Sequence, residues 1–230
     1  MKTVGIIGGL SPQSTISYYQ GLNHGACTRL GEHHNARIIL NSLDFGQFVQ
    51  LKQRGDWQRQ AELLCEAAQS LEKAGADFII LATNTMHKMA DQIIESVRIP
   101  FLHLADATAE KIINSGRNKI LLLGTRYTME QDFYIKRLEN RGIEVLVPHG
   151  EALEDVNRII YDELCHGVIE PVSKARYIQI VNDFEDHGIE GIILGCTEIG
   201  LLIDQSDFKI ECFDTTKIHI EATLNYMFEE

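Results

Sequence analysis

The chain has 230 residues and a formal net charge of −12. A surface this acidic repels phosphate backbones and anionic lipids, so we expect neither a nucleic-acid partner nor a membrane partner. The first residues lack the apolar segment of a signal peptide, and no apolar stretch is long enough to span a membrane. The five cysteines are widely spaced without a C-x-x-C pair, which indicates free thiols, no metal site and a cytoplasmic protein.

Short runs rich in Ile, Val and Leu alternate with longer amphipathic segments along the chain. The apolar runs lie at residues 4–8, 78–81, 120–123 and 192–194. The amphipathic segments, each of which stops before a glycine, lie at 57–74, 127–141 and 175–187. Runs that are apolar throughout are typical of strands buried on both faces, so the alternation predicts an α/β fold with parallel sheets.

Three pairs of segments match between the two halves of the chain, in the same order. Residues 4–9 match 120–125, residues 75–85 match 188–198, and residues 99–106 match 210–214. We therefore predict two similar doubly wound parallel-sheet domains related by a pseudo-twofold. The first would comprise residues 1–98 plus 212–230, and the second residues 99–211. One large doubly wound domain with the same elements is the alternative.

Polar turns follow four of the apolar runs, at residues 8–11, 83–85, 124–128 and 196–198. Ligands of open α/β sheets bind beyond the carboxyl ends of the strands. If the two halves face each other, all four turns meet in one cleft, which we predict to be the active site. Gly8-Gly9 does not complete the G-x-G-x-x-G pattern of dinucleotide binding, so these glycines are better explained by the close approach of a small ligand.

Cys196 follows one of these runs directly, beside Thr197 and Glu198. Backbone N–H groups at such a position can lower the pKa of a thiol and produce a thiolate. Thr83 holds the matching position in the other half. Because a racemase needs two proton-transfer groups on opposite faces of one carbon, we predict Cys196 as the base and Thr83 as the opposing proton donor. A buried structural thiol and a threonine that only forms hydrogen bonds are the alternatives.

Other turn residues carry polar groups that can hold an α-carboxylate and an α-ammonium. The predicted substrate-binding residues are Leu10, Ser11, Asn84, Thr85, Thr125, Thr128, Thr197 and Glu198. Each alone is also ordinary turn chemistry. We interpret His87 as a structural residue or as one that contacts residues of the site without touching the substrate. The remaining cysteines are expected to be core or surface residues: Cys27, Cys65, Cys165 and Cys212.

Three blocks together resemble the aspartate/glutamate racemase superfamily, in the family's order along nearly the whole chain: Gly8-Gly9-Leu10-Ser11-Pro12, Thr83-Asn84-Thr85 and Gly195-Cys196-Thr197-Glu198. The resemblance implies racemisation of a small amino acid without pyridoxal phosphate or another cofactor, by two cysteines on opposite faces of the substrate. The second family cysteine falls on Cys196 and the first on Thr83. In related glutamate racemases the second cysteine deprotonates the L-isomer, so the resemblance implies a preference for L-substrates in initial rates. Homodimers are common in the family, and we expect one here.

The resemblance fails at two charged positions. The family's aspartate racemases hold the substrate's side-chain carboxylate with an Arg and a Lys, whose places fall near Phe48 and at Cys165. We predict that Lys52, with Arg54 beside it, substitutes for them, although residues 52–54 also fit a solvated helix face. Aspartate and/or glutamate is the expected substrate.

Three alternatives stay open at this point. The chain is a racemase of a neutral polar amino acid such as homoserine, a superfamily decarboxylase or isomerase that uses only Cys196, or a non-catalytic amino-acid-binding protein on the same scaffold.

Overall fold

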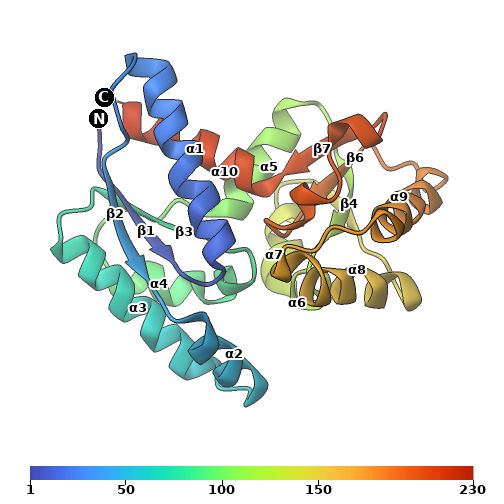
Figure 1. Ribbon diagram of the computed structural model, residues 1–230, viewed down its shortest axis with the longest axis horizontal. Coiled ribbons are helices and arrows are strands. Elements are labelled where there is room, and N and C mark those ends of the chain that lie inside the picture. The colour runs from blue at the N-terminus through green and yellow to red at the C-terminus, as the bar shows by residue number, and fades with distance from the viewer. Residues whose placement is uncertain (230) are drawn as a thin grey trace. The chain divides into compact units, whose positions relative to one another are not determined.

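The computed structural model describes residues 1–229, which divide into two compact units. Unit 1 comprises Met1–Leu104 together with residues 219–229, and unit 2 comprises Ala105–Ile218. Each unit contains one parallel sheet with helices around it (Figure 1). The predicted fold class, two parallel-sheet α/β units, is therefore confirmed. None of the helices within residues 1–229 has the length and apolar character needed to cross a membrane.

Unit 1 has a three-stranded sheet in the order β2-β1-β3. Its strands are β1 (Val4–Gly8), β2 (Ile38–Ser42) and β3 (Phe78–Leu81). Its helices are α1 (Pro12–Leu30), α2 (Phe45–Gln53), α3 (Trp57–Lys73), α4 (Ala90–Ser96) and most of α10 (Thr215–Phe228). A 3-10 helix, Thr85–Met89, joins the turn after β3 to α4.

Alternate residues of the unit 1 strands enter two separate cores. Val4 and Ile6 pack with Tyr18 of α1 and Met227 of α10, whereas Ile7 packs with Leu64 of α3. Figure 1 shows α1 and α3 on different sides of the sheet. Strands covered in this way must be apolar on both faces, which explains the continuous apolar runs of the sequence.

Unit 2 has a four-stranded sheet in the order β5-β4-β6-β7. Its strands are β4 (Lys119–Leu123), β5 (Glu144–Leu146), β6 (Gly191–Leu194) and β7 (Glu211–Asp214). Its helices are α5 (Leu104–Asn114), α6 (Arg126–Glu130), α7 (Asp132–Glu139), α8 (Glu151–Asp162) and α9 (Pro171–Glu185). Short 3-10 helices lie at Leu164–His166, Ile199–Leu201 and Gln205–Asp207. A hydrophobic core of this unit forms where α8 and α9 pack on β4 and β6.

The boundaries of the units lie later in the chain than the predicted 98/99 and 211/212. Strand β7 pairs with β6, with Cys212 beside Ile192, so residues 212–214 belong to the second sheet, and residues 212–218 belong to unit 2 and not to unit 1. Phe101 forms a parallel bridge with Ile79 of β3, so residues 99–104 stay in unit 1. In both units the last extended segment pairs with the strand before it, and the boundary follows that segment.

The predicted helices are present, with one break. The segment 57–74 is α3, which ends just before Gly75 with its φ of 92°. The segment 127–141 is divided into α6 and α7, because Gln131 adopts an extended conformation with φ −100° and ψ 142°. The segment 175–187 lies mostly within α9, which begins earlier at Pro171.

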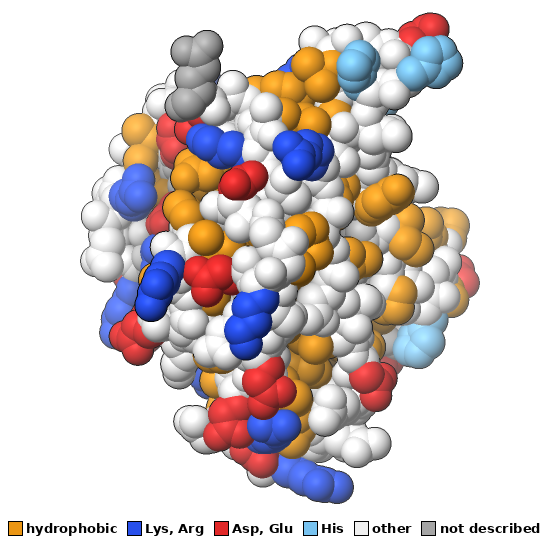
Figure 2. Space-filling view, turned by 90° about the vertical axis from the view of Figure 1, so that its left-hand side faces the viewer, with side chains coloured by type: hydrophobic (Ala, Val, Ile, Leu, Met, Phe, Trp, Pro, Cys, Tyr) orange, Lys and Arg blue, Asp and Glu red, His pale blue; other side chains and the backbone are white. Residues whose placement is uncertain are grey.

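The molecular face in Figure 2 carries acidic and basic side chains interspersed, with hydrophobic side chains between them. The net charge of −12 is therefore not gathered into a single acidic patch on this face.

His219 is a fully buried polar residue of unit 1. Its Nε2 lies 3.0 Å from the Leu102 carbonyl oxygen, and its Nδ1 lies 2.8 Å from the Tyr18 hydroxyl. A carbonyl only accepts and a phenol can donate, so the two contacts suit a neutral imidazole protonated at Nε2. Burial lowers the pKa of His219 to about 4, against the pull of its hydrogen bond to Leu102.

His219 should make the stability of the protein fall in mild acid. Between its ordinary pKa of 6.5 and the folded-state value of about 4, the unfolded chain binds more protons than the folded one. The contribution of His219 is fully present above pH 6.5 and is lost as the pH falls towards 4, by at most about 3 kcal/mol. Urea unfolding at about pH 7.5 and pH 4.5 measures this loss. We expect a smaller loss in His219→Gln, whereas exposed His34→Gln should match the wild type; equal losses in all three proteins would contradict the assignment.

Candidate active site

The turn between β1 and α1 is built on Gly9. Its φ is +80°, and a Cβ there would lie 2.1 Å from the Leu43 carbonyl oxygen, so no other residue fits without a backbone shift. The next helix is capped by Ser11, whose side chain accepts a hydrogen bond from the Ser14 N–H at 3.3 Å. This arrangement places Leu10, which is buried, and Ser11, which is partly exposed, at the carboxyl end of β1.

The turn after β3 lies at the same edge of the sheet, because β1 and β3 are parallel neighbours. The Ser14 hydroxyl donates to the Ala82 carbonyl at 2.8 Å, which connects the start of α1 to the end of β3. Thr83 follows with a half-exposed side chain, and Asn84 behind it is buried. The structure therefore brings five of the predicted residues to one edge of unit 1: Leu10, Ser11, Thr83, Asn84 and Thr85.

The equivalent edge of unit 2 carries a second group of predicted residues. Thr125 and Thr128 are buried at the end of β4, and their hydroxyl oxygens lie 3.2 Å apart. Gly195, at the end of the neighbouring β6, could not carry a Cβ, which would lie 2.8 Å from the Leu123 carbonyl oxygen. Close backbone approach thus places the turn that holds Cys196 beside the turn that holds the two threonines.

Cys196 and Thr197 both donate hydrogen bonds to the same carboxylate. The Cys196 Sγ lies 2.9 Å from Glu198 Oε2, and the Thr197 Oγ1 lies 2.7 Å from that same oxygen. Glu198 is buried, whereas Cys196 and Thr197 are partly exposed. A buried carboxylate needs such donors, and it provides a proton acceptor in contact with the thiol.

The pKa of the Cys196 thiol is raised well above its ordinary value. Burial is the largest cause, and the negative charge of Glu198 and its hydrogen bond to the sulfur follow. A backbone hydrogen bond from Glu198 acts in the opposite direction but is weaker. In the free protein Cys196 donates to Glu198, and burial and the charge of Glu198 act against the thiolate that the sequence predicts, whereas the backbone hydrogen bond favours it.

Three residues that the sequence did not assign to the site lie within electrostatic reach of Cys196. The pKa values of Tyr161 and Tyr177 are raised by burial first and by Cys196 second, and Cys165 raises the pKa of Cys196 itself. Cys165, expected only in the core or on the surface, packs against the same apolar cluster as Cys196. The two tyrosines are separated from Cys196 by long stretches of sequence, and no motif marks them.

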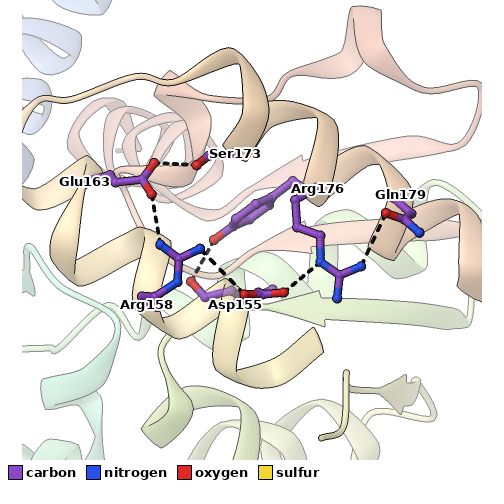
Figure 3. Close-up of polar contacts among 8 residues, drawn as sticks. Asp155, Arg158, Glu163, Ser173, Arg176 and Gln179 are labelled. Carbon is purple, nitrogen blue, oxygen red and sulfur yellow. Dashed lines mark hydrogen bonds and ion pairs between the residues drawn. The ribbon is translucent and has the colours of Figure 1, made fainter. Parts of the chain in front are cut away.

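The turn that carries Cys165 is held by an ionic network between α8 and α9 (Figure 3). Glu163, at the end of α8, accepts from the Ser173 hydroxyl at 2.5 Å and from Arg158 at 3.2 Å. Asp155 accepts from Arg176 at 2.7 Å. These mostly half-buried groups link the two helices on either side of Leu164–His166, the short 3-10 helix that contains Cys165.

The predicted carboxylate-binding residues lie on α2 and not in a strand-end turn. Lys52 is half-buried in the last turn of α2, and Arg54 is exposed at its C-cap. Phe48 of the same helix is buried in the unit 1 core. Within residues 1–229, no group of three His, Cys, Asp or Glu side chains is placed to hold a metal ion.

The chemistry of the two strand-end groups differs in kind. Unit 2 offers a thiol with an adjacent proton acceptor and several hydroxyls, which suits reversible proton transfer at carbon. Unit 1 offers the hydroxyl of Thr83, which hardly ionises in water but can donate a proton to a carbanion.

The chain is similar to known racemases in sequence and in fold. Residues 7–223 match the family model of the Asp/Glu/Hydantoin racemases. A crystal structure from Yersinia pestis, described as a candidate Asp/Glu racemase, shares 50% identity with a TM-score of 0.95, and each chain is covered to 100%. An aspartate racemase homologue from Pyrococcus horikoshii OT3 shares 40% identity with a TM-score of 0.89, again over 100% of each chain. The broad specificity amino-acid racemase RacX of Bacillus subtilis is 25% identical over 96% of each chain.

Glu198→Gln should make Cys196 more reactive towards alkylation. Loss of the carboxylate charge removes one cause of the raised thiol pKa, and each unit by which that pKa falls raises the thiolate fraction about tenfold. Mass spectrometry of the peptide that contains Cys196, after timed exposure to iodoacetamide near pH 8.5, measures the rate. Glu185→Gln, an exposed change on α9, should leave the rate at its wild-type value. A slower reaction in Glu198→Gln would show that Glu198 activates the free thiol instead.

Proposed function

We propose that this chain, which belongs to the Asp/Glu/Hydantoin racemase family and is an amino-acid racemase, interconverts the L- and D-forms of aspartate and glutamate. The observation that carries the proposal is the 2.9 Å hydrogen bond from the Cys196 thiol to Glu198 at the end of β6. This contact connects the thiol, which as a thiolate can remove a proton from carbon, directly to a carboxylate that can accept the proton of the thiol.

The first step is activation of the thiol. The Cys196 proton passes to the Glu198 carboxylate, which leaves a thiolate and a carboxylic acid. A bound α-ammonium group supplies positive charge that stabilises the thiolate, so activation is coupled to substrate binding. Thr125, Thr128 and Thr197 are the neutral groups of unit 2 that we assign to substrate binding, with Leu10, Ser11, Asn84 and Thr85 in unit 1.

The second step is inversion at the α-carbon. The thiolate removes the α-proton of the L-isomer, and the hydroxyl of Thr83 gives its proton to the opposite face of the carbanion. The thiol then holds the former α-proton, while the Thr83 alkoxide and the Glu198 acid return to their resting states by exchange with water. The carbanion is a much stronger base than an alkoxide, so donation from Thr83 is downhill, whereas proton abstraction by Thr83 is not.

This asymmetry predicts a specific kinetic pattern. The two enantiomers have equal free energy and share one transition state, so kcat/KM for racemisation is the same in both directions. The preference for the L-isomer therefore appears in kcat and, more directly, in α-proton exchange with retention of configuration. Cys196 can remove and return a proton on its own face of the L-isomer, whereas Thr83 is a poor base towards the D-isomer.

Which substrate side chain is accepted depends on positive charge at the site, and none of the turn residues that we assign to substrate binding is positively charged. Lys52 is our candidate for the side-chain carboxylate, since it lies half-buried on the helix that also carries Phe48. A neutral polar amino acid such as homoserine is the second candidate. Its support is Cys165, a neutral residue at the position that resembles the family's carboxylate-binding Lys.

The test is proton NMR in D2O with L-aspartate, D-aspartate, L-glutamate and D-glutamate supplied separately, combined with chiral analysis of the products. The wild-type protein should remove the α-proton of at least one L-isomer and form the D-product. Cys196→Ser should lower this exchange by about a thousandfold or more, because a serine hydroxyl does not ionise near neutral pH. Cys65→Ser, which alters a thiol on α3, is the matched control and should keep wild-type rates. Exchange that persists in Cys196→Ser would refute the proposed base.

A further inference from the structure

The backbone of Thr83 is held on both sides by hydrogen bonds. Its N–H donates to the Leu81 carbonyl at 2.9 Å, and its own carbonyl oxygen lies 2.7 Å from Nδ1 of His87. His87 is only 3% exposed, so water does not compete freely for this contact. The peptide that carries the proposed proton donor is thus fixed by a buried imidazole.

The two ring nitrogens of His87 have partners of opposite kind. A carbonyl oxygen only accepts, so Nδ1 must carry the proton that faces Thr83. The Leu104 N–H points at Nε2 from 3.3 Å and needs a lone pair there. Together the two contacts select the neutral tautomer protonated at Nδ1, and they connect Thr83 to the first residue of α5.

Aromatic packing prevents the ring of His87 from turning away. Its centroid lies 4.5 Å from that of His103, 5.7 Å from that of Phe101 and 6.2 Å from that of His219, all in edge-to-face arrangements. His219 is itself held by Tyr18 and Leu102. The imidazole therefore sits in a packed cluster of unit 1 whose members are tied to α1, β3 and α10.

The matching position in unit 2 has no such device. The carbonyl of Cys196 accepts from the backbone N–H of Ile199 at 3.1 Å, and Gly200 stands four residues after Cys196 as His87 stands four residues after Thr83. Cys196 is instead restrained through its side chain by Glu198. Thr83 has no carboxylate of its own in the turn, so its hydroxyl direction depends on the peptide that His87 holds.

We propose that His87 is the positioning residue of Thr83. Its Nδ1–H fixes the Thr83 peptide so that the hydroxyl faces the substrate α-carbon when the carbanion forms. The inference rests on the proposed function, because it assigns a role to His87 only if Thr83 supplies the proton of the D-product. His87 does not touch the substrate in this account and acts only through Thr83.

If His87 no longer holds Thr83, the ratio of D-product to exchanged L-isomer should change, whereas a general loss of activity would lower both. Cys196 exchanges the α-proton of the L-isomer with retention, and Thr83 determines how often the carbanion becomes the D-isomer. A misplaced Thr83 should lower D-product formation relative to exchange in recovered L-isomer. A loss of overall fold would instead lower both rates together and leave their ratio unchanged.

The experiment measures this ratio in D2O, with the L-isomer that the wild-type protein exchanges, in wild type and four variants. His87→Asn keeps an amide donor near the Nδ1 position and should retain the ratio within about twofold. His87→Gln moves the amide towards the Nε2 position and should lower the ratio about tenfold to a hundredfold, the usual cost of a misplacement of about 1 Å. Thr83→Ala should lower it at least as much. His34→Gln, on the surface of unit 1, should have no effect.

Two outcomes would overturn the inference if Thr83→Ala lowers the ratio as expected. One is a wild-type ratio in His87→Gln. The other is an equal fall of the ratio in His87→Asn and His87→Gln. A wild-type ratio in Thr83→Ala would refute the role of Thr83 and the inference with it. If His87→Gln fails to fold, nitrogen-15 NMR of the wild-type imidazole decides. A proton on Nδ1 supports the assignment, and a proton on Nε2 alone overturns it.

Discussion

One backbone hydrogen bond, formed in the same place in each unit, fixes the backbone next to the two side chains that we propose to react. The Ala82 N–H donates to the Ile7 carbonyl at 2.9 Å, and the Gly195 N–H donates to the Leu123 carbonyl at 2.7 Å. Each bond continues the pairing of parallel neighbours one residue past the end of the strand. The next residue, Thr83 in one unit and Cys196 in the other, is therefore delivered to the carboxyl edge of its sheet. The neighbouring strands β1 and β4 end at the same two edges, so the polar turns that follow them lie there as well.

The two edges have the same backbone plan and different chemistry. At Cys196 a buried carboxylate accepts a hydrogen bond from the thiol, and its negative charge adds to burial in raising the pKa of that thiol. At Thr83 the side chain has no comparable acid or base in its turn, and the peptide itself is held by His87. A thiol that can ionise stands in one unit, and a hydroxyl that can donate stands in the other. This division of roles explains why we propose directional exchange on a scaffold that is otherwise repeated.

The sequence predicted the parts of this arrangement that follow from local pattern. Apolar runs marked the strands, and the matched segments 75–85 and 188–198 marked Thr83 and Cys196 as equivalent. The matches also contained the last extended segment of each unit, although the predicted boundaries divided the chain before the first of these segments, at 98/99, and within the second, at 211/212. Pairing of β7 with β6 corrects this, and strand pairing is a tertiary contact that a linear pattern does not specify.

The electrostatics of the site could not be predicted in the same way. The pKa of a thiol depends on its burial and on whether a neighbouring carboxylate turns towards the sulfur, and residue spacing decides neither. The adjacent Glu198 was visible in the sequence, but its contact with Cys196 was not. Tyr161 and Cys165 reach the region of Cys196 only because α8 and the following turn pack on the same sheet. His87 was visible four residues after Thr83, but its tautomer depends on Leu104.

We expect that a thiol in place of the Thr83 hydroxyl would give the site a second base, so that the D-isomer loses its α-proton as readily as the L-isomer does. The direct measurement is α-proton exchange from D-aspartate in D2O by Thr83→Cys, with Thr83→Ser as the control that keeps a hydroxyl. We expect Thr83→Cys to accelerate exchange from the D-isomer at least about tenfold, because a thiol ionises far more readily than a hydroxyl, while exchange from the L-isomer persists. If the L-isomer still exchanges and the D-isomer gains nothing, Thr83 is not the group that faces the α-proton of the D-isomer.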